Sequence, residues 1–313
     1  MRKRVTLGVV VSGALALSAL AVPAAQADGG SYTPEDISKI AQAARDASAA
    51  ADGKSAFRAA AAEPGVPYTL DLKFSGVKVN NGKPIVAGTS AIVSVPVTYK
   101  VTHAADIDIT DPELFVNVEI YRGDFTDPTN FLYGDEPHTC TATSSTAANC
   151  KGKIDIYPDI ELTNADATSW KGVGYAIDLN GQDPLDPNAD WGQIGYVDQD
   201  KVTTTKLQRL SKLTVNASPE PVKKGKTITV TGKLSRANWD TGKYAGYSTQ
   251  PVKLQFRKKS SSTYTTVKTI KTNSKGELKT TVKASQDGYY RYSFAGTSTT
   301  PAVNATGDFI DVK

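Results

Sequence analysis

The sequence of 313 residues contains only two histidines and two cysteines, and this scarcity limits the chemistry that the chain can perform. His103 and His138 belong to no recognisable motif with a serine or cysteine nucleophile, and no Gly-x-Ser-x-Gly turn is present. Carboxylates are plentiful, but carboxylates in acidic loops are usually just solvated. We therefore expect a protein that is not an enzyme, and a glycosidase-type acid pair is the remaining catalytic alternative.

Long apolar runs are also lacking after the first residues. The chain begins with MRKR, continues with VTLGVVVSGALALSALAV, and then has small residues at Ala25 and Ala27. This order is typical of a signal peptide, here residues 1–27, cut before Asp28. A retained membrane anchor is disfavoured because the run is short and rich in Ala, Gly and Ser. We expect a secreted, extracellular protein with no membrane contact after cleavage.

The two cysteines predict one disulfide, Cys140 to Cys150, because exported chains meet an oxidising environment. The alternative is a zinc site that adds His103 and His138. The His138-Thr-Cys140 spacing departs from that of the usual metal fingers, and a disulfide accounts for both thiols.

Charge is divided sharply along the chain. Residues 67–200 hold 8 basic and 20 acidic side chains, net −12, whereas residues 211–313 hold 18 basic and 6 acidic ones, net +12. Such asymmetry concerns partners and solubility rather than fold.

The segment 28–66 reads as a helical, partly flexible N-terminal extension. Thr33 can cap a helix that begins at Pro34 and runs to about Ala50, with a narrow apolar stripe. The stripe consists of Ile37, Ile40, Ala41, Ala44 and Ala47.

Beyond Pro67 the apolar period changes to two, which predicts short strands separated by Gly, Pro, Asn and Asp. Residues 67–208 are expected to form an acidic β-sandwich that carries the disulfide, and residues 209–313 a basic Ig-like sandwich of seven strands. The fold class is thus all-β, with two antiparallel Ig-like β-sandwich domains in tandem after the helical extension. The expected strands of the second domain are 212–218, 226–234, 251–259, 263–272, 277–285, 289–296 and 308–313.

The run "RLSKLTVNASPEPVKKGKTITVTGKLSRANWDTGKYAGYSTQPVKLQFRKK", followed by "DGYYRYSFAGTST", resembles an Ig-like module near the C-terminus of exported proteins of actinomycete-type bacteria. The preceding segment with "CTATSSTAANC" and "TSWKG" looks like its usual partner domain. The resemblance implies a sandwich fold and an exported location. It implies no activity, so it supplies no catalytic residues. From the residues themselves, Asp287-Gly288-Tyr289-Tyr290 at the start of the sixth expected strand looks like a tyrosine corner.

Two loops are candidate binding sites. Asp186, Asn188 and Asp190 have the D-x-N-x-D spacing of a calcium loop, although Trp191 stands where an EF-hand has glycine; calcium is the one cofactor that the sequence suggests, and none is required. The loop "RANWDTGKYAGY" offers a cation–aromatic set that could hold an anionic cell-wall polymer or a carbohydrate. That set is Arg236, Trp239, Lys243, Tyr244 and Tyr247.

These patterns favour a secreted, non-catalytic binding or structural protein at or outside a bacterial cell wall. A calcium-stabilised extracellular protein and a carbohydrate-active enzyme or its accessory domain are the alternatives. No nucleic-acid motif is present, and the sequence leaves the oligomeric state open.

Overall fold

The computed structural model describes residues 32–52 and 65–313, with side chains omitted for residues 50–52. The predicted signal peptide and its cleavage site lie outside these residues. The chain forms two compact units: one contains the described residues up to 83 with 94–156 and 170–205, and the other contains 84–93, 157–169 and 206–313. We call them the acidic unit (20 acidic and 11 basic side chains described) and the basic unit (9 acidic and 20 basic).

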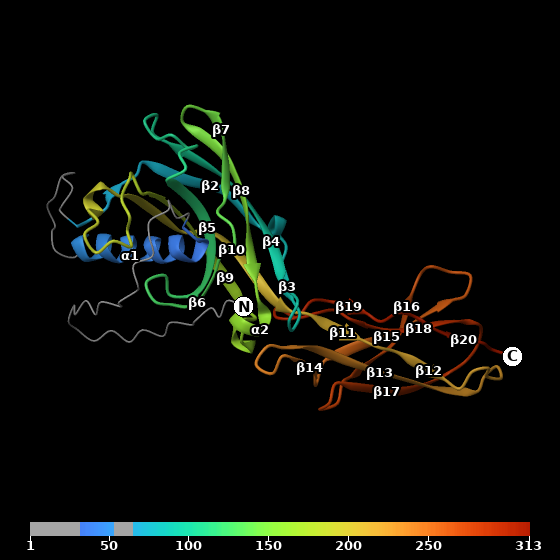
Figure 1. Ribbon diagram of the computed structural model, residues 1–313. Coiled ribbons are helices and arrows are strands. Elements are labelled where there is room, and N and C mark those ends of the chain that lie inside the picture. The colour runs from blue at the N-terminus through green and yellow to red at the C-terminus, as the bar shows by residue number, and fades with distance from the viewer. Residues whose placement is uncertain (1–31, 53–64) are drawn as a thin grey trace. The chain divides into compact units, whose positions relative to one another are not determined.

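The acidic unit is built on two β-sheets (Figure 1). One has the order β1-β10-β9-β5-β6 and the other the order β2-β4-β8-β7; β1 joins β10 in parallel, and nearly all other pairs are antiparallel. β10 continues into the basic unit, where Leu207–Arg209 pair with β3 (Ile85–Ala87). The strands of the acidic unit are β1 Tyr68–Thr69, β2 Leu72–Val79, β4 Val93–His103, β5 Leu114–Gly123, β6 Pro128–Leu132, β7 Thr139–Ser144, β8 Ala147–Ile156, β9 Ser169–Asp178 and β10 Gly195–Arg209.

β4 illustrates why these segments form half-buried strands. Val95, Val97, Tyr99 and Val101 are buried, and the residues between them are exposed. A period of two places one row in the core and the other in solvent. The alternation expected beyond Pro67 is therefore confirmed within β4, whereas Ile92 lies just before the strand and is 58% exposed.

β5 is buried on both of its faces, because α1 (Pro34–Asp52) covers the side that does not face the second sheet. Ile37, Ile40, Ala41 and Ala44 are at most 3% exposed and pack against a cluster of residues from β9, β10 and the loop that joins them. These partners are Tyr175, Ile177, Leu179, Ile194 and Tyr196.

The start of α1 follows its sequence. Thr33 Oγ1 accepts from the Asp36 backbone N–H, and Asp36 Oδ2 accepts from the Thr33 backbone N–H, which is a capping box with Asp in place of Glu. The predicted cap is confirmed, and the predicted apolar stripe is buried except at Ala47, which is only partly buried.

The alternation expected beyond Pro67 is interrupted at Pro158. β8 ends at Ile156, and Pro158 begins a one-turn helix, α2 (Pro158–Glu161), in the part of the chain that belongs to the basic unit. The segment Cys140 to Cys150 forms the β7–β8 hairpin, in which the two cysteines are directly paired and disulfide-bonded. The disulfide is confirmed, and a zinc site that uses both thiols is excluded.

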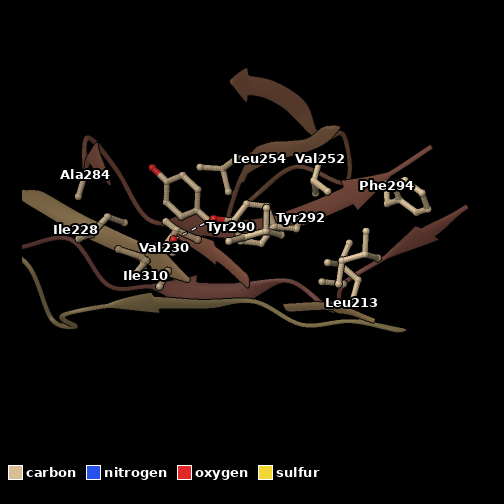
Figure 2. Packing of buried hydrophobic residues seen from close by; sticks show 14 of the residues in the cluster. Leu213, Ile228, Val230, Val252, Leu254, Ala284, Tyr290, Tyr292, Phe294 and Ile310 are labelled. Atoms are coloured by element: carbon tan, nitrogen blue, oxygen red, sulfur yellow. Dashed lines mark hydrogen bonds between the residues drawn. The ribbon is translucent and has the colours of Figure 1, made fainter. Parts of the chain in front are cut away.

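The basic unit packs two sheets face to face around one core, as an Ig-like sandwich does. Figure 2 shows that core, to which Val230, Leu254, Tyr292 and Ile310 contribute. The first sheet contains β11 Ser211–Leu213, β12 Asn216–Ser218, β13 Thr227–Asn238, β14 Lys243–Gly246 and β17 Glu277–Lys283. The second contains β15 Pro251–Lys258, β16 Thr265–Lys271, β18 Gly288–Phe294, β19 Val303–Asn304 and β20 Asp308–Ile310.

The predicted tyrosine corner stays a prediction, and the tyrosine bond that the structure shows here is a different one, which crosses the core to the facing sheet. The Tyr292 hydroxyl donates to the Val230 carbonyl, 2.9 Å away on β13 of the facing sheet (Figure 2). Asp287, in the predicted corner, instead accepts from the Val312 backbone N–H. Side chains alternate between the two faces of β18, so Tyr290 and Tyr292 point into the core and Tyr289 points outward.

β16 is an edge strand, and one of its lysines closes the gap to the facing sheet. Lys268 Nζ donates to the Thr281 carbonyl at 2.9 Å and to Thr280 Oγ1 at 3.2 Å, both on β17. Among the described residues, no helix is both long and apolar enough to cross a membrane.

Candidate functional site

The outer face of the β15–β18–β20 sheet carries a row of cationic and aromatic side chains that we call the cation–aromatic face. Register places Gln255 opposite Arg291, Arg257 opposite Tyr289, and Tyr289 opposite Phe309. Tyr264 joins them from the turn before β16. All six side chains are partly exposed. The members are Gln255, Arg257, Tyr264, Tyr289, Arg291 and Phe309.

The rings and the guanidinium groups alternate in direct contact. The Arg257 guanidinium carbon lies 3.8 Å from the Tyr289 ring centroid, and that of Arg291 lies 3.8 Å from the Tyr264 centroid. The Tyr289 and Phe309 rings are 5.1 Å apart. Cation–π attraction holds such an array without a carboxylate.

Glycine at position 307 lets Tyr264 lie across the face. A Cβ on Gly307 would come within 2.1 Å of the Tyr264 hydroxyl oxygen. Any larger residue would displace the tyrosine and open its contact with Arg291.

The face has an excess of positive charge. Lys253 lies on the same side of β15, and Lys259 follows the strand. In the described structure, neither arginine of the face forms an ion pair, and the only carboxylate paired with the neighbouring lysines is that of Asp287, 3.9 Å from Lys259 Nζ. Arg257 donates to the Ser261 carbonyl, and Arg291 donates to Gln255 Oε1. Guanidinium groups carry five N–H donors each, so most remain available to a ligand.

The structure does not bring together the five residues predicted in the loop 236–247. That segment is a hairpin of β13 and β14 rather than a loop. Trp239 is only 4% exposed, and its indole N–H donates to the Gly88 carbonyl at 2.6 Å. The Trp239 side chain therefore packs inside the basic unit.

The turn beside Trp239 is held by Asn164, which lies in the short 3-10 helix Asn164–Asp166 of the same unit. The Asn164 side chain accepts from the Trp239 backbone N–H at 3.1 Å and donates to Asn238 Oδ1 at 2.7 Å. It also donates to Asp240. These bonds fix the hairpin end.

The other four residues separate into distinct contacts. Lys212 Nζ lies 3.6 Å from the Tyr244 ring centroid, and the Arg236 guanidinium lies 3.8 Å from the Tyr247 centroid. Lys243 is exposed at the start of β14. Binding of a ligand by these residues stays a prediction.

The predicted calcium residues lie in an exposed turn between β9 and β10. Asp186 Oδ1 accepts from the backbone and side-chain N–H groups of Asn188, and Asp190 Oδ1 accepts from the Gly192 backbone N–H. In the part of the chain that the structure describes, no three His, Cys, Asp or Glu side chains are grouped as metal ligands. A calcium site that uses Asn188 stays a prediction.

The acidic unit has one buried polar network. His138 Nδ1 lies 3.1 Å from the Tyr99 hydroxyl, its backbone N–H donates to Asn117 Oδ1, and burial lowers its pKa to about 4. Tyr175 donates to Glu119, which is 4% exposed, at 2.7 Å. Burial thus keeps His138 neutral at physiological pH, and the hydrogen bonds, which include one from Asn117 Nδ2 to the Tyr175 hydroxyl, link β4, β5 and β9.

Parity could have revealed the cation–aromatic face from the sequence. In "VKLQFRKK" and "GYYRYSF" the apolar residues alternate with Lys253, Gln255, Arg257, Tyr289 and Arg291, so these five share the outer side. The strand register is needed to show that the residues of β15 lie opposite those of β18. No alternation in the sequence places Tyr264 or Phe309 on this face.

No protein-family model matches the sequence, and no curated protein matches it. Solved structures that resemble it include an adhesin of Yersinia pseudotuberculosis, InvE, at 12% identity over 77% of this chain and 58% of that one, with a TM-score of 0.24. The D00-D0 domain of intimin has 14% identity over 75% and 98% of the two chains and a TM-score of 0.23. FdeC, an Escherichia coli adhesin, has 17% identity over 80% and 65%, with a TM-score of 0.22. The sandwiches described above establish the fold class without these matches.

Proposed function

We propose that this chain is an exported, non-catalytic protein that binds an anionic polymer at or outside the bacterial cell wall, and that the cation–aromatic face is its contact surface. The observation that carries the proposal is the stacking of Arg257 and Arg291 on tyrosine rings without a carboxylate partner among the described residues. Export is supported by the predicted signal peptide and by the disulfide.

The chemistry of the face suits a polymer that combines acidic groups with sugar rings. A guanidinium group matches phosphate and carboxylate oxygens with paired donors. Half-exposed aromatic rings provide flat apolar surface for the faces of sugars. The net charge of the basic unit adds attraction at longer range, which weakens as salt increases.

The test is retention of the chain that begins at Asp28 on purified cell-wall polymer at low and at high salt. The double variant Arg257→Gln/Arg291→Gln should weaken binding about tenfold or more, as expected for the loss of two charge-assisted contacts. Absence of retention at low salt would overturn the proposal.

A matched control separates a site from general charge attraction. Lys279 and Lys283 are exposed on β17 of the other sheet, and Lys279→Gln/Lys283→Gln removes the same two charges. This control should retain most of the affinity. Equal losses in the two double variants would show that net charge, and not the face, is responsible.

A further inference from the structure

Arg209 and Arg236 bring two guanidinium groups to one place in the basic unit, separate from the cation–aromatic face. Arg209 ends β10, and its Nε donates to the Ala237 carbonyl at 2.6 Å. Arg236 precedes Ala237 on β13, and its Nη1 donates to Thr300 Oγ1 at 3.1 Å and Thr299 Oγ1 at 3.4 Å. The Arg209 backbone N–H also donates to the Thr299 carbonyl at 3.0 Å, so both arginines contact the short loop 297–300.

No carboxylate contacts this pair in the described structure. Neither arginine forms an ion pair with a described carboxylate. Arg209 is only 8% exposed, and burial, followed by the charge of Arg236, lowers its pKa to about 10, although the charge of Asp240 offsets part of that effect. A buried cation without a contacting anion destabilises a fold, so an anion bound beside Arg209 and the partly buried Arg236 would offset part of that cost.

Hydroxyl groups complete the surroundings of the pair. The Tyr247 hydroxyl lies 3.4 Å from Thr297 Oγ1, which lies 3.4 Å from Thr299 Oγ1. Arg236 stacks on the Tyr247 ring. Thr297 is exposed, so the group opens to solvent on that side.

We propose that Arg209 and Arg236, together with the hydroxyls of Thr297, Thr299 and Tyr247, bind a phosphate group. Two guanidinium groups supply charge and directed N–H donors, and hydroxyls that now bond to one another can rotate to donate to phosphate oxygens. The phosphate belongs either to a free phosphate ion or to a phosphodiester of a polymer.

The experiment measures thermal unfolding and backbone NMR shifts of the chain from Asp28 during titration with inorganic phosphate, with chloride at equal ionic strength as the reference. Phosphate should raise the melting temperature and move the Thr297–Thr299 amide signals in a saturable way. Dimethyl phosphate is the second probe: binding of both probes assigns the site to a diester, and binding of phosphate alone assigns it to the free ion. Equal effects of phosphate and chloride would overturn the proposal.

Arg236→Gln should weaken phosphate binding about tenfold, the effect of losing one charge-assisted contact. Because Arg209 variants risk misfolding, Thr299→Val provides a second test that leaves both cations in place, and it should weaken binding less. Arg257→Gln/Arg291→Gln should leave phosphate binding unchanged, so this site and the cation–aromatic face can fail independently. Unchanged binding in Arg236→Gln would contradict the assignment.

Discussion

Tyrosine side chains serve opposite purposes in the two units. In the acidic unit five tyrosine hydroxyls donate to carboxylates, whereas in the basic unit four tyrosine rings lie under cations. The acidic pairs are Tyr32–Asp183, Tyr68–Asp178, Tyr121–Asp200, Tyr175–Glu119 and Tyr196–Asp198. The basic pairs are Tyr244–Lys212, Tyr247–Arg236, Tyr264–Arg291 and Tyr289–Arg257.

The difference follows from the charge that each unit has in excess. A phenol hydroxyl is a neutral donor that satisfies a carboxylate where cations are few. The face of the same ring is negative and attracts a cation where carboxylates are few. Tyr121 does both, since Lys171 Nζ lies 5.5 Å from its ring centroid.

The largest expected difference between the two units is in how their stability responds to acid, because the acidic unit buries His138 in its neutral form. Burial lowers its pKa from 6.5 to about 4, so the unfolded chain takes up a proton that the folded chain does not. Stability of this unit should therefore fall as pH decreases from about 6.5 to about 4, by up to about 3 kcal/mol.

Both histidines belong to the acidic unit, so the basic unit has no such dependence. Urea unfolding, followed by NMR signals from each unit at pH 7 and pH 5, tests the expectation. His138→Gln should remove this part of the pH dependence. An unchanged slope in that variant would mean that other groups cause it.

Removal of one hydroxyl from the acidic unit should cost about 2 kcal/mol, the worth of a hydrogen bond to a charged group. Tyr175→Phe retains the ring but removes the hydroxyl that donates to buried Glu119 at 2.7 Å. Denaturant midpoints at constant m-value give the change. A neutral result would show that the hydroxyl is dispensable, and the comparison between the units would fail.

In the basic unit the ring should matter and the hydroxyl should not. Tyr289→Ala loses contact with Arg257 and Phe309 and should cost about 1 kcal/mol. Tyr289→Phe keeps both contacts and should stay within about 0.5 kcal/mol of the parent chain. Equal losses in the two variants would contradict the assigned role of the ring.

The smallest expected effect is a shift of one tyrosine pKa. Burial and then Asp183 raise the pKa of Tyr32 to about 12. Asp183→Asn removes the negative charge beside the Tyr32 hydroxyl and keeps an acceptor oxygen, so it should lower that pKa only part of the way to 10, measured by NMR titration of labelled tyrosine. Tyr68, whose neighbours are Asp178 and Asp106, is the internal control and should not change.

The sequence predicts the structural elements that depend on residues close together in the chain. Thr33, Pro34 and the spacing of Ile37 and Ile40 predict α1, and alternation predicts most strands. The surface on which α1 packs could not be predicted from the sequence. Asn117 and Glu119 alternate with the core residues of β5, and polar residues in such a row are usually exposed to solvent. They are buried under a helix far away in the sequence.

The candidate site shows the same division. Outward parity of Arg257 and Arg291 is local, but their pairing with Tyr289 and Tyr264 depends on strand register and on a turn. The sequence predicts a binding site in residues 236–247 because their aromatic side chains are close together in the chain. Trp239 nevertheless turns inward, since Gly88 and Asn164 meet it from distant segments.

The contact of Lys268 with β17 bears on the proposed binding to a polymer, which would bring many copies of the protein close together. An open edge such as β16 offers unpaired backbone groups to the edge of another copy, which is a route to aggregation. A lysine bonded across to Thr280 and Thr281 keeps a cation at that edge and ties it to the opposite sheet. High local concentration on a surface can then be reached without sheet-to-sheet fusion.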